Sequence, residues 1–279
     1  MAEENKFLEI VDLKKGYGSG ETRQEVLRGM TFSVARGEIC VLLGPSGSGK
    51  STLLNIIGGI DSADAGFISI GGDKLEDMGE KALTQYRRKH LGYVFQLYNL
   101  IANLNVKENI EVGAYLSDAP LDIDELLHTL GLYEHRHKLP NQLSGGQQQR
   151  VAFARALVMG QEILLLDEPL SNLDAKLRVE VRTELRQIQQ KFGITTMYVT
   201  HDQEEAMAIS DRIAVMSDGV ITYETAKVAL DKLEIDELGL DGNDRRMLET
   251  LIRFYKGGPV GLETCLLYTS PSPRDGLLS

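Results

Sequence analysis

The sequence lacks several features that would point to a membrane-spanning, secreted or disulfide-stabilised protein. Its 279 residues include only two cysteines, too few for a disulfide framework. The longest apolar runs, such as residues 163–166, are far shorter than the roughly 20 residues that cross a bilayer. The chain opens on a polar, net acidic segment instead of a secretory signal, so we expect a cytoplasmic protein.

The sequence also lacks an excess of positive charge. Lysine and arginine total 30 against 41 aspartate and glutamate residues, which gives a net charge of −11. A protein that binds nucleic acid needs a basic face to neutralise the phosphates. We therefore expect no nucleic-acid partner.

What the sequence does contain is a phosphate-binding loop. Residues 44–51 read Gly-Pro-Ser-Gly-Ser-Gly-Lys-Ser, which matches G-x-x-x-x-G-K-[ST], and they follow the apolar run 39–43 as a strand should. The glycines let backbone N–H groups curl around phosphate oxygens, Lys50 reaches the outer phosphates, and the Ser51 hydroxyl can ligate Mg²⁺. An ordinary Gly/Ser-rich turn is the alternative, but a chance match in a chain this long is on the order of 1%.

A second string, Leu-Ser-Gly-Gly-Gln at residues 143–147, favours a true phosphate-binding loop over a chance match. This string after a phosphate loop resembles the signature of the ATP-binding-cassette (ABC) ATPases. The resemblance implies an α/β fold of the P-loop NTPase class, with a mixed or parallel sheet core, an N-terminal antiparallel β subdomain and an inserted helical subdomain.

The hydrophobic pattern agrees with an α/β fold. Short β-rich runs at residues 7–11, 30–34 and 38–43 precede a helix at 51–57, and residues 101–139 have helical spacing. Compact apolar runs at 163–166 and 195–199 are typical of buried parallel strands. We expect an ATPase domain over residues 1–222 with its helical subdomain at about 97–160, because strands alternate with helices.

Further motifs occur in the order that the family requires. Residues 163–168 resemble the Walker B strand, in which Asp167 would hold Mg²⁺ and Glu168 would polarise the attacking water. By the same resemblance Gln96 would touch Mg²⁺ or water, and His201 would contact the γ-phosphate. Taken alone, each has an ordinary alternative, since many strands end in acids and a lone histidine is more often structural.

Two more positions complete the expected nucleotide site. Asp174 ends a string, 171–174, that resembles the D-loop of the cassette dimer, and Tyr17 follows the first strand where the family stacks an aromatic ring on adenine. An ordinary turn tyrosine is the alternative for Tyr17. The expected cofactors are ATP and Mg²⁺. The expected catalytic residues are Glu168, His201 and Gln96, and the expected metal ligands are Ser51, Gln96 and Asp167. The expected nucleotide-binding residues are Tyr17, Gly44, Pro45, Ser46, Gly47, Ser48, Gly49, Lys50, Ser51, Thr52, Ser144, Gly145, Gly146, Gln147 and Asp174.

The resemblance also implies partners. Ser144, Gly145 and Gly146 would complete the site of a second subunit in a head-to-tail homodimer, with the signature helix N-terminus facing the γ-phosphate. Transmembrane permease subunits would hold the protein on the inner face of the membrane. Hydrolysis of ATP would then drive transport.

The motifs do not all resemble one kind of cassette. Strings at 92–100 and 106–110 resemble lipoprotein and antimicrobial-peptide export cassettes, whereas 167–178 and 201–206 resemble sugar-importer cassettes, with the change within or just after 143–157. We expect export, with a sugar importer as the alternative. A nucleic-acid-linked ATPase is a third possibility, because of the C-terminal region.

The C-terminal region departs from both kinds of cassette. Residues 226–264 resemble part of the bacterial Holliday-junction branch-migration motor, and 265–275 resemble a translated transposase-type sequencing adapter. An ordinary Ser/Pro-rich tail is the alternative. We expect a chimeric reading frame, with a foreign helical segment at 223–256 and a disordered, artefactual tail at 257–279.

Overall fold

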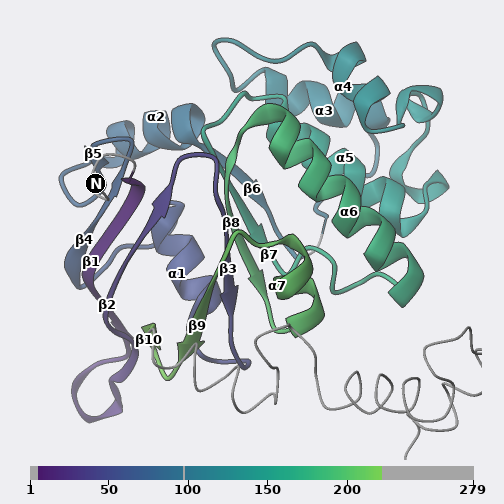
Figure 1. The fold of residues 1–279 in the computed structure, drawn as a ribbon. Coiled ribbons are helices and arrows are strands. Elements are labelled where there is room, and N and C mark those ends of the chain that lie inside the picture. The colour runs from purple at the N-terminus through teal and green to yellow at the C-terminus, as the bar shows by residue number, and fades with distance from the viewer. Residues whose placement is uncertain (1–5, 97, 222–279) are drawn as a thin grey trace, which may run out of the picture. The chain divides into compact units, whose positions relative to one another are not determined.

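The computed structural model describes residues 6–96 and 98–221, which all belong to one compact unit (Figure 1). The expected foreign segment at 223–256 and tail at 257–279 lie outside the described residues. The unit contains two β-sheets with helices packed between and around them.

The larger sheet has six strands in the order β10-β9-β3-β8-β7-β6. All neighbours are parallel except β10, which runs antiparallel to β9. The runs 163–166 and 195–199, predicted as buried parallel strands, are confirmed: they form β7 and β8, which pair in parallel. Alternate side chains of β7 enter two different apolar cores, so both faces of the strand are buried. The strands are β3 (Ile39–Leu43), β6 (Leu91–Val94), β7 (Ile163–Asp167), β8 (Thr195–Thr200), β9 (Arg212–Ser217) and β10 (Val220–Ile221).

The smaller sheet is antiparallel, as expected for the N-terminal part, with the order β2-β1-β4-β5. Its strands are β1 (Lys6–Tyr17), β2 (Gln24–Ala35), β4 (Ala65–Ile70) and β5 (Asp73–Lys74). Helix α1 (Lys50–Ile57) shares one buried apolar core with strands of both sheets. The helix that follows the phosphate loop is therefore held on two sides.

The prediction of helix across residues 101–139 is only partly correct. The segment contains α3 (Val106–Ala114), α4 (Ile123–Thr129) and a 3₁₀ turn, η2 (Tyr133–His135), separated by loops. Asn105 and Asp122 begin the two helices by accepting hydrogen bonds from the N–H groups of their first turns. The proline before Asp122 and a left-handed Gly131 exclude one continuous helix.

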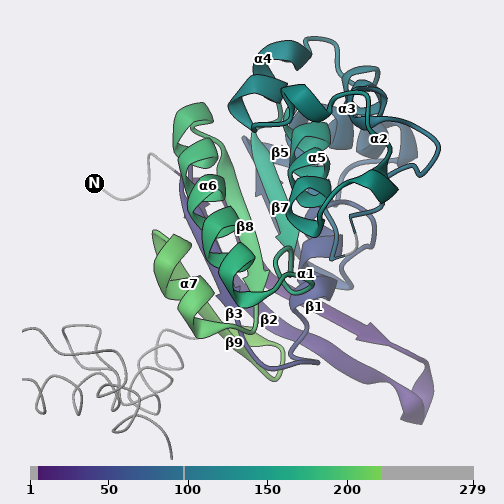
Figure 2. The ribbon, with the colours of Figure 1, turned by 90° about the vertical axis from the view of Figure 1, so that its right-hand side faces the viewer.

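The remaining helices enclose the second core. Another 3₁₀ turn, η3 (Pro140–Gln142), leads into the signature helix α5. Helices α5, α6 and α7 lie on the face of the six-stranded sheet opposite α1 (Figure 2). Their apolar side chains share the second core with that face. The three helices on this face are α5 (Gly145–Leu157), α6 (Ala175–Phe192) and α7 (Gln203–Ile209). Helix α2 (Glu80–His90) directly precedes β6.

Candidate functional site

The phosphate loop connects β3 to α1, and its shape requires glycine. Gly47 and Gly49 have left-handed backbones, with φ of 80° and 98°. A Cβ on Gly44 would lie 2.2 Å from the Met216 carbonyl oxygen, closer than any side chain allows. The loop is therefore pressed against β9 while its backbone curls back on itself, as an anion-binding loop does.

Lys50 lies inside this loop. It is 5% exposed, and its Nζ donates to the carbonyl oxygens of Gly44 and Pro45, each at 2.8 Å. Burial lowers the pKa of the Lys50 ammonium, against the attraction of Glu168 and Asp167. The same loop holds Ser48, whose buried Oγ has no hydrogen-bond partner among the described residues. Both groups can donate to a phosphate oxygen.

Two carboxylates leave the sheet at the end of β7, beside the start of α1. The Ser51 hydroxyl donates to Asp167 Oδ1 at 3.1 Å. Burial raises the pKa of Asp167, and the negative charge of Glu168 raises it further. The hydrogen bond from Ser51 lowers the pKa but does not cancel the rise. Mg²⁺ binds oxygen ligands and is held in many nucleotide sites by one or two carboxylates together with substrate phosphates. The oxygens of Ser51 and Asp167 fit that coordination.

Glu168 is held in an uncommon conformation. Its φ is 45°, in the left-handed region, and its N–H donates to the Val199 carbonyl of the adjacent strand at 3.0 Å. Its Oε1 lies 3.2 Å from Nδ1 of His201, which follows β8. The structure thus brings Glu168 and His201 together at the carboxyl edge of the sheet, where α/β proteins place their ligands.

The loop that carries Gln96 is joined to the loop after β7. Asn172 Nδ2 donates to the Gln96 carbonyl oxygen at 2.9 Å. Asp174 caps α6: its side chain accepts a hydrogen bond from the Leu177 N–H at 3.0 Å. The motif order pointed to Gln96 and Asp174, but nothing in the sequence indicated the Asn172 contact.

Tyr17 is fixed at its hydroxyl end, and its side chain is 45% exposed. The hydroxyl donates to Asp61 Oδ2 at 2.6 Å, and the largely buried Lys15 donates to Asp61 Oδ1 at 2.7 Å. The bond to Asp61 is the main reason that the pKa of Tyr17 is raised. Burial opposes ionisation of Asp61, but its bonds from Lys15 and Tyr17 hold its pKa below the ordinary value. Sequence reasoning found Tyr17 and missed both partners.

The signature residues form the start of α5. Ser144 Oγ accepts from the Gln147 N–H at 3.3 Å, and Gln147 Oε1 accepts from the Ser144 N–H at 3.0 Å, a reciprocal capping box. A Cβ on Gly146 would lie 2.9 Å from Leu177 Cδ1 of α6, so glycine permits this close approach. Within the described chain no hydrogen bond joins the signature to the phosphate loop.

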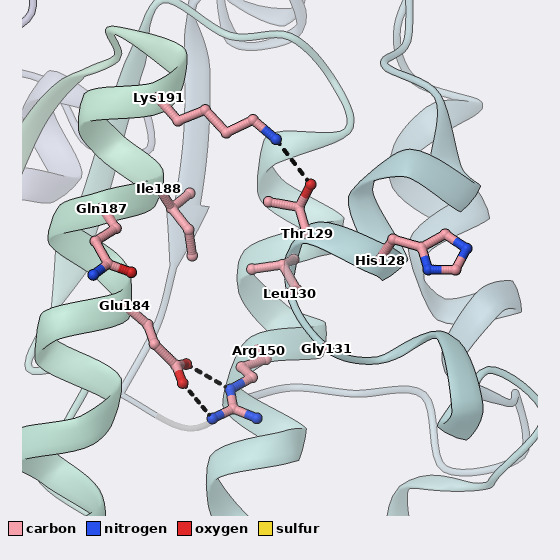
Figure 3. Close-up of a pocket in the computed structure, with 9 residues that line it drawn as sticks. All are labelled: His128, Thr129, Leu130, Gly131, Arg150, Glu184, Gln187, Ile188 and Lys191. Carbon is pink, nitrogen blue, oxygen red and sulfur yellow. Dashed lines mark hydrogen bonds and ion pairs between the residues drawn. The ribbon is translucent and has the colours of Figure 1, made fainter.

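A groove of about 450 Å³ separates the end of α4 from α6 (Figure 3). Arg150 of α5 donates twice to Glu184 of α6, with both distances 2.7 Å, and Lys191 Nζ donates to Thr129 Oγ1 at 3.0 Å. These bonds tie the helices inserted between β6 and β7 to α6. None of the expected site residues lines this groove. Its lining residues are His128, Thr129, Leu130, Gly131, Arg150, Glu184, Gln187, Ile188 and Lys191.

The family model described as ABC transporter matches residues 27–171, from β2 through the loop after β7. The chain belongs to the ABC transporter family. It carries the ATP-binding domain of that family, whose ATP-binding subunits are ATPases. Among the described helices, none has both the length and the apolar character that crossing a bilayer requires.

Curated relatives of this ABC domain differ in transport type. The Fe(3+) ions import ATP-binding protein FbpC of Fusobacterium nucleatum is 44% identical over 221 residues, which are 77% of this chain and 57% of that protein. The lipoprotein-releasing system ATP-binding protein LolD of Geobacter metallireducens is 41% identical over 222 residues, 78% of this chain and 99% of that protein. The chain thus matches little more than half of the first relative and nearly all of the second.

Solved structures agree on the fold of the ABC domain. A dimeric post-hydrolysis state of the ATP-binding cassette MJ0796, bound to ADP and Pi, is 36% identical with a TM-score of 0.68 and covers 77% of this chain and 96% of that one. The cbiO1 protein of Clostridium perfringens, part of the complex cbiONQ, is 28% identical with a TM-score of 0.74 and covers 91% and 97%. The expected ABC cassette fold is confirmed.

Proposed function

We propose that this protein binds ATP with Mg²⁺ and hydrolyses it to drive transport across a membrane. The observation that carries the proposal is the meeting of β3, β7 and β8 at one edge, where Lys50, the carboxylates Asp167 and Glu168, and His201 come together. Phosphoryl transfer to water needs positioning and charge neutralisation more than covalent chemistry, and these residues supply both.

The residues of this edge have distinct roles in the proposal. Backbone N–H groups of the phosphate loop and Lys50 bind the outer phosphates of ATP. Ser51, Asp167 and Gln96 would hold Mg²⁺, which neutralises phosphate charge when bound. Glu168 accepts a proton from the attacking water, and its contact with His201 orients the carboxylate.

We further propose that two copies bind ATP between them. Ser144, Gly145 and Gly146 would face the γ-phosphate held by the other copy, so each site would be completed in trans. Support comes from the dimeric cassette MJ0796 with ADP and Pi. Such a two-fold arrangement is self-complementary and closes at two subunits.

Transport of lipoprotein or peptide out of the membrane or cell is the type we favour. The reasons are the export-like strings at 92–100 and 106–110 and the nearly full-length match to LolD. An importer of the iron or sugar kind is the alternative, supported by the match to FbpC and by the importer-like strings after β7. In either case membrane permease subunits would hold the protein at the inner membrane face.

The expected domain limits remain part of the proposal. Residues 1–222 would be the ATPase domain, with a helical subdomain at about 97–160. Residues 226–264 and 265–275 would be foreign segments of a chimeric reading frame. Sequencing intact genomic DNA across the 3′ end of the gene tests this, and recovery of the same codons would refute it. A nucleic-acid-linked function has only the 226–264 resemblance in its favour, and salt-sensitive DNA binding would reveal it.

Two substitutions separate binding from hydrolysis. Lys50→Ala should weaken ATP binding by about 10- to 150-fold, because a charge-assisted bond worth roughly 1.5–3 kcal/mol is lost. Glu168→Gln should keep ATP affinity while kcat falls by about 10² or more, since the amide keeps the shape and loses the basicity. Fluorescent-nucleotide titration and phosphate release measure the two effects.

The same Glu168→Gln variant tests the dimer. With MgATP it should sediment or scatter light as a dimer, and adding Ser144→Arg should return it to a monomer, because a bulky side chain then occupies the phosphate position. Glu168→Gln protein that binds ATP as a monomer at all concentrations would contradict the proposed dimer. Unchanged ATP affinity in Lys50→Ala would contradict the proposed nucleotide site.

A further inference from the structure

The side chain of Gln147 is held at both ends, and the second contact comes from outside the signature. Its Oε1 accepts from the Ser144 N–H, and its Nε2 lies 2.9 Å from Nε2 of His135. A backbone N–H can only donate, so the carbonyl end of Gln147 must face Ser144 and the NH₂ end must face His135. The imidazole Nε2 therefore accepts this hydrogen bond.

This assignment leaves the other imidazole nitrogen unsatisfied. With Nε2 as the acceptor, the proton of neutral His135 is on Nδ1. That atom is buried and has no hydrogen-bond partner among the described residues. A buried donor without a partner is destabilising. This orientation of the His135 ring therefore does not stabilise its own loop, and the contact with Gln147 needs another explanation.

Backbone hydrogen bonds on both sides of His135 hold its loop in place. The His135 N–H donates to the Leu132 carbonyl at 2.8 Å. The carbonyls of Arg136 and Lys138 accept from the Lys107 and Val106 N–H groups, each at 3.0 Å. N–H groups in the first turn of a helix have no partner within the helix. The loop supplies those partners and so caps α3. His135 is thereby attached to a rigid frame outside α5.

We infer that His135 is a positioning residue for the signature: it holds the Gln147 amide, which holds the N-terminus of α5 at Ser144. The inference rests on the proposed function, in which Ser144 meets the nucleotide of a second copy. The capping box alone holds only the Oε1 end of the Gln147 amide, through the Ser144 N–H, and gives the NH₂ end no partner, so the amide can turn. The bond to His135 removes that freedom, so the serine hydroxyl and the first amides of α5 are aligned before the copies meet.

The test uses the full chain carrying Glu168→Gln, with three further variants. His135→Leu removes the acceptor and places an apolar side chain at this half-buried position. His135→Gln restores an acceptor at the distance of Nε2, because its amide oxygen stands at the same number of bonds from Cβ. His137→Leu is the matched control, since His137 is exposed and lies two residues away.

His135→Leu should weaken the MgATP-dependent dimer by about tenfold or more, because each dimer contains two such contacts. Nucleotide affinity of the monomer should stay unchanged, since the Lys50 loop is not touched. His135→Gln should recover most of the dimer affinity, and His137→Leu should behave as the parent protein. Equal dimer affinity in all four proteins would overturn the inference.

A second measurement needs no dimer and so separates this inference from the proposed function. Hydrogen exchange of the Ser144 and Gln147 amides in the monomer should be about tenfold faster in His135→Leu and near the parent rate in His135→Gln. Exchange that is the same in both variants would overturn the positioning role, whatever the dimer does. If the parent Glu168→Gln protein does not dimerise while the exchange rates differ as expected, the proposed dimer fails and the positioning role stands.

Discussion

At the scale of single residues, the proposed nucleotide site depends on side chains that orient other side chains. Tyr17 offers its ring to solvent, yet its hydroxyl is held by Asp61, which is held in turn by Lys15. An aromatic ring that is already fixed loses less conformational freedom when a base stacks on it. The tether at Asp61 should therefore strengthen adenine binding without touching the nucleotide.

Tyr17→Phe tests this tether, because it keeps the ring and removes the hydroxyl. ATP affinity should fall by about 3- to 10-fold, because the freed ring must be ordered when the base stacks on it, at a cost of about 0.5–1.5 kcal/mol. Affinity for tripolyphosphate, which has no base, should not change. Asp61→Ala should weaken ATP binding in the parent protein and add little in the Tyr17→Phe background, since the two residues act as a pair. Additive effects, or an equal loss for tripolyphosphate, would show that the tether does not act through the ring.

At the scale of helices and strands, the close contact of α3 with α5 depends on one glycine. A Cβ on Gly113 would lie 2.3 Å from the Arg155 carbonyl oxygen and 2.9 Å from Val158 Cγ1. The first neighbour is backbone and cannot turn away, so the helices must separate. The packing loss should exceed the gain in helix propensity that alanine brings.

Gly113→Ala should therefore lower the free energy of unfolding by about 1–3 kcal/mol, measured by urea denaturation. Gly79→Ala is the matched control, because a Cβ there meets nothing within 4 Å and its φ is not left-handed. Gly79 is the N-cap residue of α2, where glycine is favoured over alanine, so the control should lower the free energy of unfolding by less than about 1 kcal/mol. Equal stability of the two variants would mean that α3 is free to move away from α5.

The strands that carry the site could be predicted from the sequence, because each is a short apolar run that ends at a motif. Helix α3 and helix α4 were predicted as one, since leucines at helical spacing continue past Pro120. Contacts such as His135 with Gln147 and Asn172 with Gln96 join segments that only the fold brings together. The spacing of apolar residues along the chain gives no information on such pairs. The sequence therefore predicted the motif residues but not the residues that hold them in place.

At the scale of the whole molecule, Asp211 joins three elements. Its carboxylate accepts from the Ile39 N–H at 2.8 Å and from the Arg186 guanidinium, so it holds the entries of β3 and β9 against α6. The hydrogen bonds from Arg186, against some opposition from burial, hold the pKa of Asp211 below its ordinary value of 3.8. The ionised form is thus favoured more in the folded state than in the unfolded state.

The sign of the pH effect follows from that lowered pKa. The stabilisation is complete above about pH 5 and is lost as the pH falls through the folded-state pKa, because the unfolded chain takes up the proton first. Asp211→Asn should be less stable than the parent at pH 7 and should lose less stability between pH 5 and pH 3. Urea titrations at several pH values measure this. Asp118→Asn, at an exposed site, controls for the loss of one charge. Parallel pH profiles of the parent and Asp211→Asn would contradict the prediction.

The contact of Gly44 with Met216 has a consequence for how the protein is made. Strand β3 lies between β8 and β9, and the phosphate loop rests on the carbonyl of Met216, near the end of the described chain. At 5–20 residues per second, the ribosome needs roughly 10 to 35 seconds to add the intervening stretch of about 170 residues. Throughout that interval the nascent chain contains the whole phosphate-binding string but not the strand that shapes it. We therefore expect that nucleotide does not assist the early folding of this protein, and that a chain released before β9 has emerged carries the motif without the folded loop.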